Sequence, residues 1–142
     1  MKTAVLFILF LAIAFGFNTL DSKNGHDVLR ELEAGNHNVY VIMFHAGATE
    51  GSALDERNND YENTLNDRVL DKYENFWFTK VDANNRDYSE LIKQCDIIVD
   101  DLRKSPSILI MENGNGAWIH GPQTIAKLEE YAPAYNKRSQ KA

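Results

Sequence analysis

Nearly unbroken apolar runs are the clearest pattern in the chain, and they are typical of strands covered on both faces of a sheet. Val39 to His45 and Phe76 to Asp82 are rich in β-branched and aromatic residues. A third run, Ser107 to Met111, follows Pro106 and leads through an Asn-Gly turn into Ala117 to His120. The sequence therefore predicts two central strands and an antiparallel hairpin, with a proline at a position where no ladder hydrogen bond is lost.

Apolar residues at helical spacing predict helices between and after these strands. Val28, Leu29 and Leu32 share one face of the first such segment, whereas acidic residues between Ser52 and Tyr73 are interpreted as the solvated face of a long polar helix. The alternation of helices with strands predicts an α/β fold. The predicted helices cover His26 to Ala34, Ser52 to about Tyr73, Arg86 to Cys95, and Gln123 to Tyr131.

An apolar segment precedes the predicted domain. Met1-Lys2-Thr3 is followed by Ala4 to Phe17, fourteen residues without a charge. One positive charge before a short apolar run is typical of a cleaved secretory signal peptide. A helix from Thr3 to Leu20 would instead be about 27 Å long and would span a thin bilayer marginally. Both alternatives stay open, and we take residues 1–20 as a retained anchor that contacts lipid through residues 3–20, with the domain across the membrane.

Composition and charge exclude several functions. The 142 residues are 44% hydrophobic, enough for the core of one domain. The formal net charge of −6 argues against binding to nucleic acid, which needs a basic surface.

A short basic tail, residues 137–142, is predicted to be a frayed end. The single cysteine, Cys95, excludes an internal disulfide and all two-cysteine motifs, and we interpret it as a buried apolar residue rather than a redox sensor.

The order of elements resembles a thioredoxin-fold domain over residues 22–136. The matching features are the apolar strand ending in Phe44, the segment Phe78-Thr79-Lys80-Val81-Asp82, the segment Ser105-Pro106-Ser107 before the hairpin, and Gly121 before the last helix. The resemblance implies a three-layer α/β/α domain with a central mixed sheet, preceded by the N-terminal hydrophobic helix. It also places Pro106 at the family's cis-proline, so a cis Ser105–Pro106 bond is expected, although cis is otherwise the minority state.

The active loop is where this chain departs from the family, which carries Trp-Cys-Gly-Pro-Cys after the first central strand. Aligned on Phe44, the chain has Ala48, Thr49, Glu50 and Gly51 there, and no cysteine. Disulfide exchange needs a thiolate nucleophile and a second thiol to resolve the mixed disulfide. The resemblance therefore implies a vestigial loop without dithiol oxidoreductase activity, and it disfavours a peroxiredoxin or glutathione-transferase enzyme as well.

Three further residues are candidates for a binding rim near Pro106. The resemblance brings His45, Trp118 and His120 to the same edge as the proline, where the two histidines and Glu50 could form a weak metal or acid-base site. No ligand spacing supports a metal site, and the simpler interpretation is two rim histidines with local hydrogen bonds. Trp118 is either a core residue or an exposed interface anchor.

These observations predict a non-catalytic, membrane-anchored thioredoxin-like protein without cofactors. We expect an accessory or structural subunit whose partners are neighbouring subunits of a membrane complex, with a mitochondrial inner-membrane respiratory assembly as the first expectation. The domain would then face the intermembrane space. The alternative is a lumenal protein of the endoplasmic reticulum that resembles the non-catalytic domains of protein disulfide isomerases, which bind polypeptides.

Overall fold

A computed structural model describes residues 16–140 of the chain. The predicted anchor therefore lies outside the described residues over positions 1–15, as do residues 141–142. The strands are β1 (Asn18–Thr19), β2 (Val39–His45), β3 (Phe76–Asp82), β4 (Ser107–Glu112) and β5 (Asn115–Ile119). The helices are α2 (Gly25–Leu32), α3 (Ala53–Arg68), α4 (Ser89–Gln94), α5 (Val99–Leu102) and α6 (Thr124–Gln140), with 3₁₀ turns η1 (Leu70–Lys72) and η2 (Arg86–Tyr88).

The strands form one mixed sheet in the order β1-β3-β2-β4-β5. β1, β3 and β2 are parallel, whereas β4 is antiparallel to β2 and β5 is antiparallel to β4. The carboxyl ends of β2, β3 and β5 therefore lie at one edge of the sheet, together with the start of β4. This edge is where an open α/β sheet usually holds its ligands.

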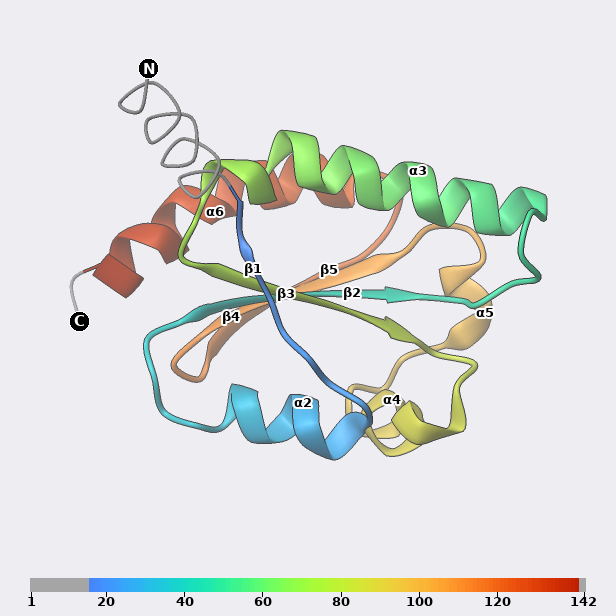
Figure 1. Cartoon of the computed structure of the whole chain (residues 1–142), viewed down its shortest axis with the longest axis horizontal. Helices are drawn as coiled ribbons and strands as arrows, with labels where there is room; N and C mark the ends of the chain where they lie inside the picture. The colour runs from blue at the N-terminus through green and yellow to red at the C-terminus, as the bar shows by residue number, and fades with distance from the viewer. Residues whose placement is uncertain (1–15, 141–142) are drawn as a thin grey trace, which may run out of the picture.

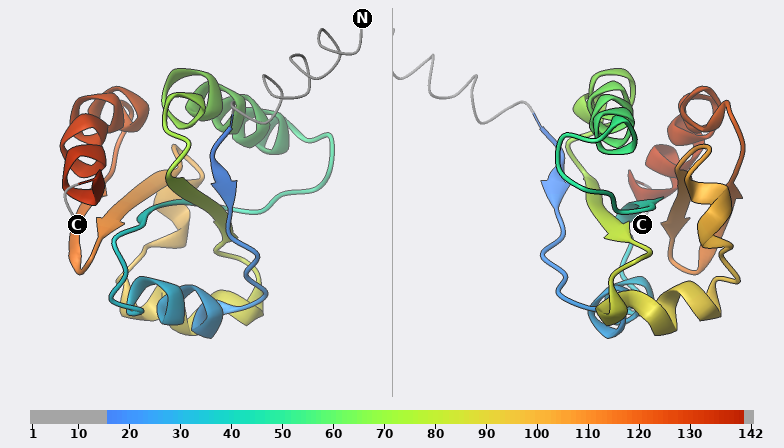
Figure 2. Two further views of the ribbon diagram at one scale, coloured as in Figure 1. Left: turned by 60° about the vertical axis from the view of Figure 1, so that its left-hand side comes forward. Right: turned by 90° about the vertical axis from the view of Figure 1, so that its right-hand side faces the viewer.

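Helices cover both faces of the sheet, as the α/β/α expectation requires (Figures 1 and 2). Helices α3 and α6 lie side by side on one face, and α2 and α4 lie on the other. Successive strand residues point to opposite faces, so β2 supplies apolar side chains to both layers. The three-layer fold predicted from the sequence is confirmed over the described residues.

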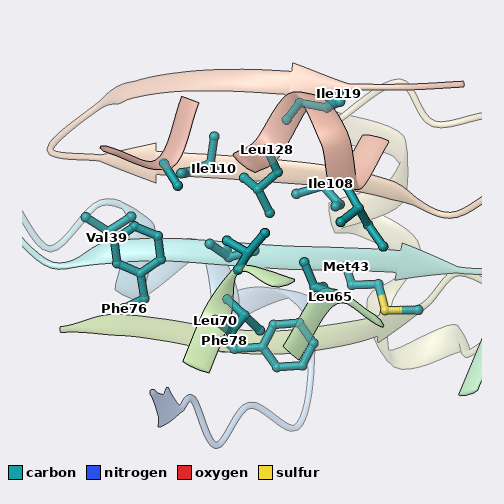
Figure 3. Close-up of a cluster of buried hydrophobic side chains, with 14 of the residues drawn as sticks. Val39, Met43, Leu65, Leu70, Phe76, Phe78, Ile108, Ile110, Ile119 and Leu128 are labelled. Atoms are coloured by element: carbon teal, nitrogen blue, oxygen red, sulfur yellow. The ribbon is translucent and has the colours of Figure 1, made fainter. Parts of the chain in front are cut away.

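The core between the sheet and the α3–α6 layer contains alternate residues of the central strands (Figure 3). Val39, Val41 and Met43 of β2 belong to it, and each is at most 1% exposed. Leu65 and Leu128 meet these side chains from α3 and α6. Burying a side chain of this size contributes about 1.5–3 kcal/mol, so this layer is a main source of stability.

The second core lies between the sheet and the layer of α2, α4 and α5. Ile42 and Phe44 of β2 pack with Val28 of α2, Leu91 of α4 and Leu102 of α5. All five side chains are at most 1% exposed. The helices of this layer are short, and each packs on the sheet through a few apolar residues.

The amino-terminal expectation needs correction where the structure describes it. The helix predicted to reach Leu20 is wrong at its end, because Asn18–Thr19 form β1 beside β3 and the Leu20 N–H donates to the Phe78 carbonyl at 2.8 Å. Without β1 the outer edge of β3 would leave backbone groups unpaired. Within residues 16–140 no helix combines the length and the apolarity needed to cross a membrane.

The carboxyl-terminal expectation also needs correction. Lys137 and Arg138 are not in a frayed tail but in the last turn of α6, which continues past the predicted end at Tyr131 and through Pro133. Tyr135 is 7% exposed and packs in the core, so the extra turns are held by burial. Basic residues at a helix carboxyl end are also favoured by the helix dipole.

Candidate functional site

The edge formed by β2 and β3 is closed by one aspartate. Asp82, opposite His45 in the strand register, accepts hydrogen bonds from the Gly47 and Asn84 backbone N–H groups, both at 2.9 Å to Oδ1. The Asn84 side chain donates in turn to the Gly47 carbonyl at 2.9 Å. These bonds hold the chain that leaves β2 against the chain that leaves β3.

The start of α3 is fixed by reciprocal side-chain bonds. The Ser52 hydroxyl accepts from the Asp55 N–H at 3.2 Å, and the Asp55 carboxylate accepts from the Gly51 N–H at 2.9 Å. This pattern resembles a capping box, in which the carboxylate would accept from the N–H of the N-cap residue, Ser52. Here it accepts from the N–H of the preceding residue, Gly51. One turn further, the buried Asn58 amide donates to the Ala46 carbonyl at 2.9 Å, which satisfies a backbone group immediately after β2.

Between these fixed points the vestigial loop, Ala48 to Gly51, is exposed to solvent at each of its residues. It carries no thiol. Cys95 lies at the carboxyl cap of α4 and packs against the core on the α2 side. Burial raises the pKa of the Cys95 thiol, which disfavours the reactive thiolate.

Pro106 is buried immediately before β4, but its peptide bond is not the one expected. No peptide bond in residues 16–140 is cis, so Ser105–Pro106 is trans and the expected cis bond is wrong. The trans form is the preferred state of an X-Pro bond by about 0.5–1 kcal/mol. The resemblance to the thioredoxin site is therefore one of position, not of backbone geometry.

The two candidate histidines lie at the same sheet edge but on opposite faces. His45 follows the face of Met43, towards α3, because side chains alternate along β2. The His120 ring lies on the other face, 3.4 Å from the Ser107 hydroxyl and edge-on to Trp118 at 4.9 Å between ring centroids. The joint site of His45, His120 and Glu50 is therefore wrong, because the sheet separates the two imidazoles.

Trp118 combines the two roles that the sequence left open. Its ring is half-buried and packs edge-on against Phe44, with ring centroids 5.1 Å apart. The ring also packs edge-on against His120. Trp118 therefore links the core on the α2 side to the exposed rim near Pro106.

His45 lines a polar pocket of about 160 Å³ between α3 and β3. Asp82, Glu62 and Lys80 also line this pocket, and Lys80 donates to Glu62 at 2.8 Å. Nδ1 of His45 is buried without a hydrogen-bond partner among the described residues. Burial lowers the pKa of His45, and the positive charge of Lys80 acts in the same direction, whereas Asp82 opposes it.

This lowered pKa predicts a loss of stability in mild acid. The unfolded chain binds a proton at the ordinary histidine pKa of 6.5, above the pKa of His45 in the folded protein. The free energy of unfolding should therefore fall as the pH drops below 6.5 towards the pKa of His45 in the folded protein, because protonation favours the unfolded state. We compare urea unfolding at about pH 7.5 and about pH 5.5. Between these pH values the free energy of unfolding should fall less for His45→Gln than for the unchanged protein. His26→Gln, at an exposed ring, should keep the full loss, and identical behaviour of the two variants would contradict the assignment.

Two larger cavities flank the segment from Lys104 to Pro106. The first, about 790 Å³, lies on the α5 side and is lined by Ile97, Ile98, Leu102 and His120 among others. We call it the apolar groove. Ile98 is 65% exposed there, an unusual position for a large aliphatic side chain. The second cavity, about 480 Å³, lies between α3 and α6.

Metal chemistry gains no support from this arrangement. Over the described part of the chain, no three histidine, cysteine, aspartate or glutamate side chains come together as ligands for an ion.

Three residues at this edge were not predicted from the sequence as site residues: Asp82, Asn58 and Ile98. Asp82 and Asn58 act through contacts with distant loop backbone, which no sequence pattern marks. Ile98 lies between the helix predicted to end at Cys95 and the strand predicted from Ser107, where the sequence predicts no element.

Comparison with solved structures agrees with this geometry. A reduced thioredoxin pre-protein of Schistosoma mansoni matches with a TM-score of 0.57 and 19% identity, over 83% of this chain and 98% of that one. Thioredoxin O1 of Arabidopsis thaliana in its oxidized state matches with a TM-score of 0.57 and 15% identity, over 84% and 96% of the two chains. The short form of thioredoxin F from spinach chloroplast has a TM-score of 0.57 and 16% identity, over 84% and 93%. No protein-family model and no curated protein sequence matches.

The chain thus has a thioredoxin-like fold and lacks the CxxC motif. The fold follows from the shared topology and from these matches, at identities too low to carry function. The absence of the motif follows from the sequence, since Cys95 is the one cysteine and no alignment of the loop can supply a pair.

Proposed function

We propose that this protein is a non-catalytic thioredoxin-like binding module that holds a segment of a partner polypeptide in the apolar groove. The observation that carries the proposal is the groove itself, with the exposed Ile98 at a site that has no cysteine pair. An exposed aliphatic side chain next to a cavity is a feature of interaction surfaces. The cysteine pair of the fold's redox members is missing, and the groove with its exposed isoleucine supports a binding role instead.

The shape and lining of the groove suit an extended segment with one apolar side chain. Its accessible apolar wall comes from Ile97 and Ile98, and its polar positions include Ser107 and His120. A volume of about 790 Å³ is within the usual range for binding sites, about 300–1,000 Å³. The apolar wall would bury the partner's side chain, and the polar groups would orient its backbone.

We further propose that the module is an accessory subunit tethered by the apolar segment at its amino terminus. Support comes from the sequence, in the uncharged run from Ala4 to Phe17. A mitochondrial inner-membrane assembly, with the domain in the intermembrane space, remains our preferred setting. Polypeptide binding is common to this role and to the lumenal alternative in the endoplasmic reticulum, so a test of the groove does not depend on the compartment.

Binding of an unfolded polypeptide tests the groove directly. The full chain in detergent micelles is titrated into a fluorescent, reduced and alkylated model polypeptide, and anisotropy is recorded. Ile98→Asp should weaken binding about tenfold or more, because burial of an isoleucine contributes about 1.5–3 kcal/mol. Tyr131→Asp is the matched control, since Tyr131 is also an exposed large side chain, 40% exposed, but lies on α6 outside the groove.

Two results would contradict this proposal. The first is no binding by the unchanged protein at millimolar concentration, and the second is an equal loss in both variants. A separate assay addresses catalysis: reduction of insulin disulfides by dithiothreitol should run at the same rate with and without the protein. A measurable acceleration would show that the protein is an enzyme after all.

A further inference from the structure

The apolar groove does not end at the Pro106 segment. Leu102, Lys104, Ser105 and Pro122 line both the groove and the 480 Å³ cavity between α3 and α6. These residues form a shared wall with one space on each side. A polypeptide segment bound in the groove can therefore cross this wall and place its next side chains in the second cavity.

The second cavity has a charge opposite to that of the whole chain. Its lining carries Arg57, Arg68, Arg103 and Lys104 against one carboxylate, Asp60. The chain as a whole has a formal charge of −6. We call this space the cation-lined cavity, because basic side chains gather there in a protein with a surplus of acidic residues.

Two of these cations remain without an acidic partner. Arg68 pairs with Glu129, and Arg103 approaches Asp100 at 3.8 Å. Among residues 16–140 no carboxylate lies within ion-pair distance of Arg57 or Lys104. An uncompensated charge beside a cavity favours a ligand group of the opposite sign.

One of these cations, Arg57, is also held in place at the shared wall. The Arg57 guanidinium donates to the Lys104 carbonyl at 2.8 Å and to the Arg103 carbonyl at 3.3 Å. These bonds fasten α3 to the segment that carries Lys104. Because a positioned charge loses little freedom on binding, it discriminates between ligands better than a mobile one.

The opposite side of the groove has acidic groups. Asp96 and Asp101 line it, on the α5 side and not in the cation-lined cavity. The charged side chains therefore differ in sign across the site, with Asp96 and Asp101 on the α5 side and Arg57 and Lys104 in the cation-lined cavity. A segment with acidic residues on the side of the cation-lined cavity matches these charges, and a segment with basic residues on that side does not.

Resting on the proposed function, we infer that the partner segment carries aspartate or glutamate residues next to the apolar side chain that enters the groove. The apolar side chain packs against Ile97 and Ile98. The carboxylates then cross the shared wall and meet Lys104 and Arg57 in the cation-lined cavity.

Three fluorescent peptides of equal length test this inference on the full chain in detergent micelles. Each has one leucine followed by three identical residues, which are glutamate, glutamine or lysine. At low salt the glutamate peptide should bind about five- to tenfold tighter than the lysine peptide, the reverse of what the overall charge of the protein favours. Raising the salt to about 0.5 M should reduce this preference, because exposed charges are screened.

Two variants assign the preference to the cavity. Lys104→Gln should lower the ratio of glutamate to lysine affinity about two- to threefold and leave the glutamine peptide within about twofold. Lys127→Gln makes the same charge change on α6 but outside the lining, and it should leave the ratio unaltered.

The outcomes separate this inference from the proposal on which it rests. If the lysine peptide binds as tightly as the glutamate peptide, or if both variants change the ratio equally, the acidic partner is excluded, whereas the proposed function is not contradicted. If none of the peptides binds at millimolar concentration, the proposed function fails and the inference fails with it.

Discussion

Replacing Phe44 by alanine is expected to lower the free energy of unfolding by about 3–5 kcal/mol. Phe44 ends the apolar part of β2, is 0% exposed, and packs with Ile42, Leu102 and Trp118 on the α2 side of the sheet. Deleting its ring removes buried contacts and leaves a cavity that a central strand cannot close. Urea unfolding followed by far-ultraviolet circular dichroism measures the change.

Two further variants set the scale for this result. Phe44→Leu keeps most of the volume and should lose less than the alanine variant, by about 2 kcal/mol or more. Tyr131→Ala removes an aromatic ring that is 40% exposed and should change the free energy of unfolding by about 0.5 kcal/mol or less. A loss below about 1 kcal/mol for Phe44→Ala would contradict the packing described here.

The central strands are the part of the fold that the sequence predicted best. β2 and β3 have the bounds that the apolar runs indicated, Val39–His45 and Phe76–Asp82. A strand covered on both faces needs apolar residues at nearly every position, so its pattern is continuous and its ends are sharp. Strand β1 has no such pattern, because Asn18–Thr19 lie at the sheet edge and are held by backbone bonds that suit almost any residue.

The end of the final helix could not be predicted from the sequence, for a different reason. The prediction ended at Tyr131, whereas α6 continues to Gln140 through Pro133. A proline usually ends or kinks a helix, so its presence hides the turns that follow. Those turns persist because Ala132 and Tyr135 are buried against the sheet, a tertiary contact that local sequence does not reveal.

The candidate site was predicted in position but not in its contacts. The loop after Phe44 and the segment before β4 do lie at one edge of the sheet, as the resemblance implied. Which face each histidine takes depends on the register between β2 and β5, and that register is set through β4. The bonds from Arg57 to the carbonyls of the Lys104 segment span 46 and 47 residues, beyond the reach of any spacing rule.

Gly47→Ala is expected to lower the free energy of unfolding by about 2–4 kcal/mol, because the added methyl group would overlap the Asp82 carboxylate. A Cβ atom on residue 47 would lie 2.5 Å from Cγ of Asp82, a distance that real contacts do not reach. The loop or the aspartate must move, and the bond from the Gly47 N–H to Asp82 is then lost. Chemical unfolding of the variant measures this cost.

A double-mutant cycle identifies the clash as the cause. Asp82→Ala removes the carboxylate that meets the new methyl group, so Gly47→Ala should cost at least about 1 kcal/mol less in that background. Gly51→Ala is the comparison within the same loop: its φ is +80° with open space around it, so it should cost about 1–2 kcal/mol from backbone strain alone. That cost should be the same with or without Asp82. Equal costs of Gly47→Ala in both backgrounds would show that the aspartate does not constrain the loop.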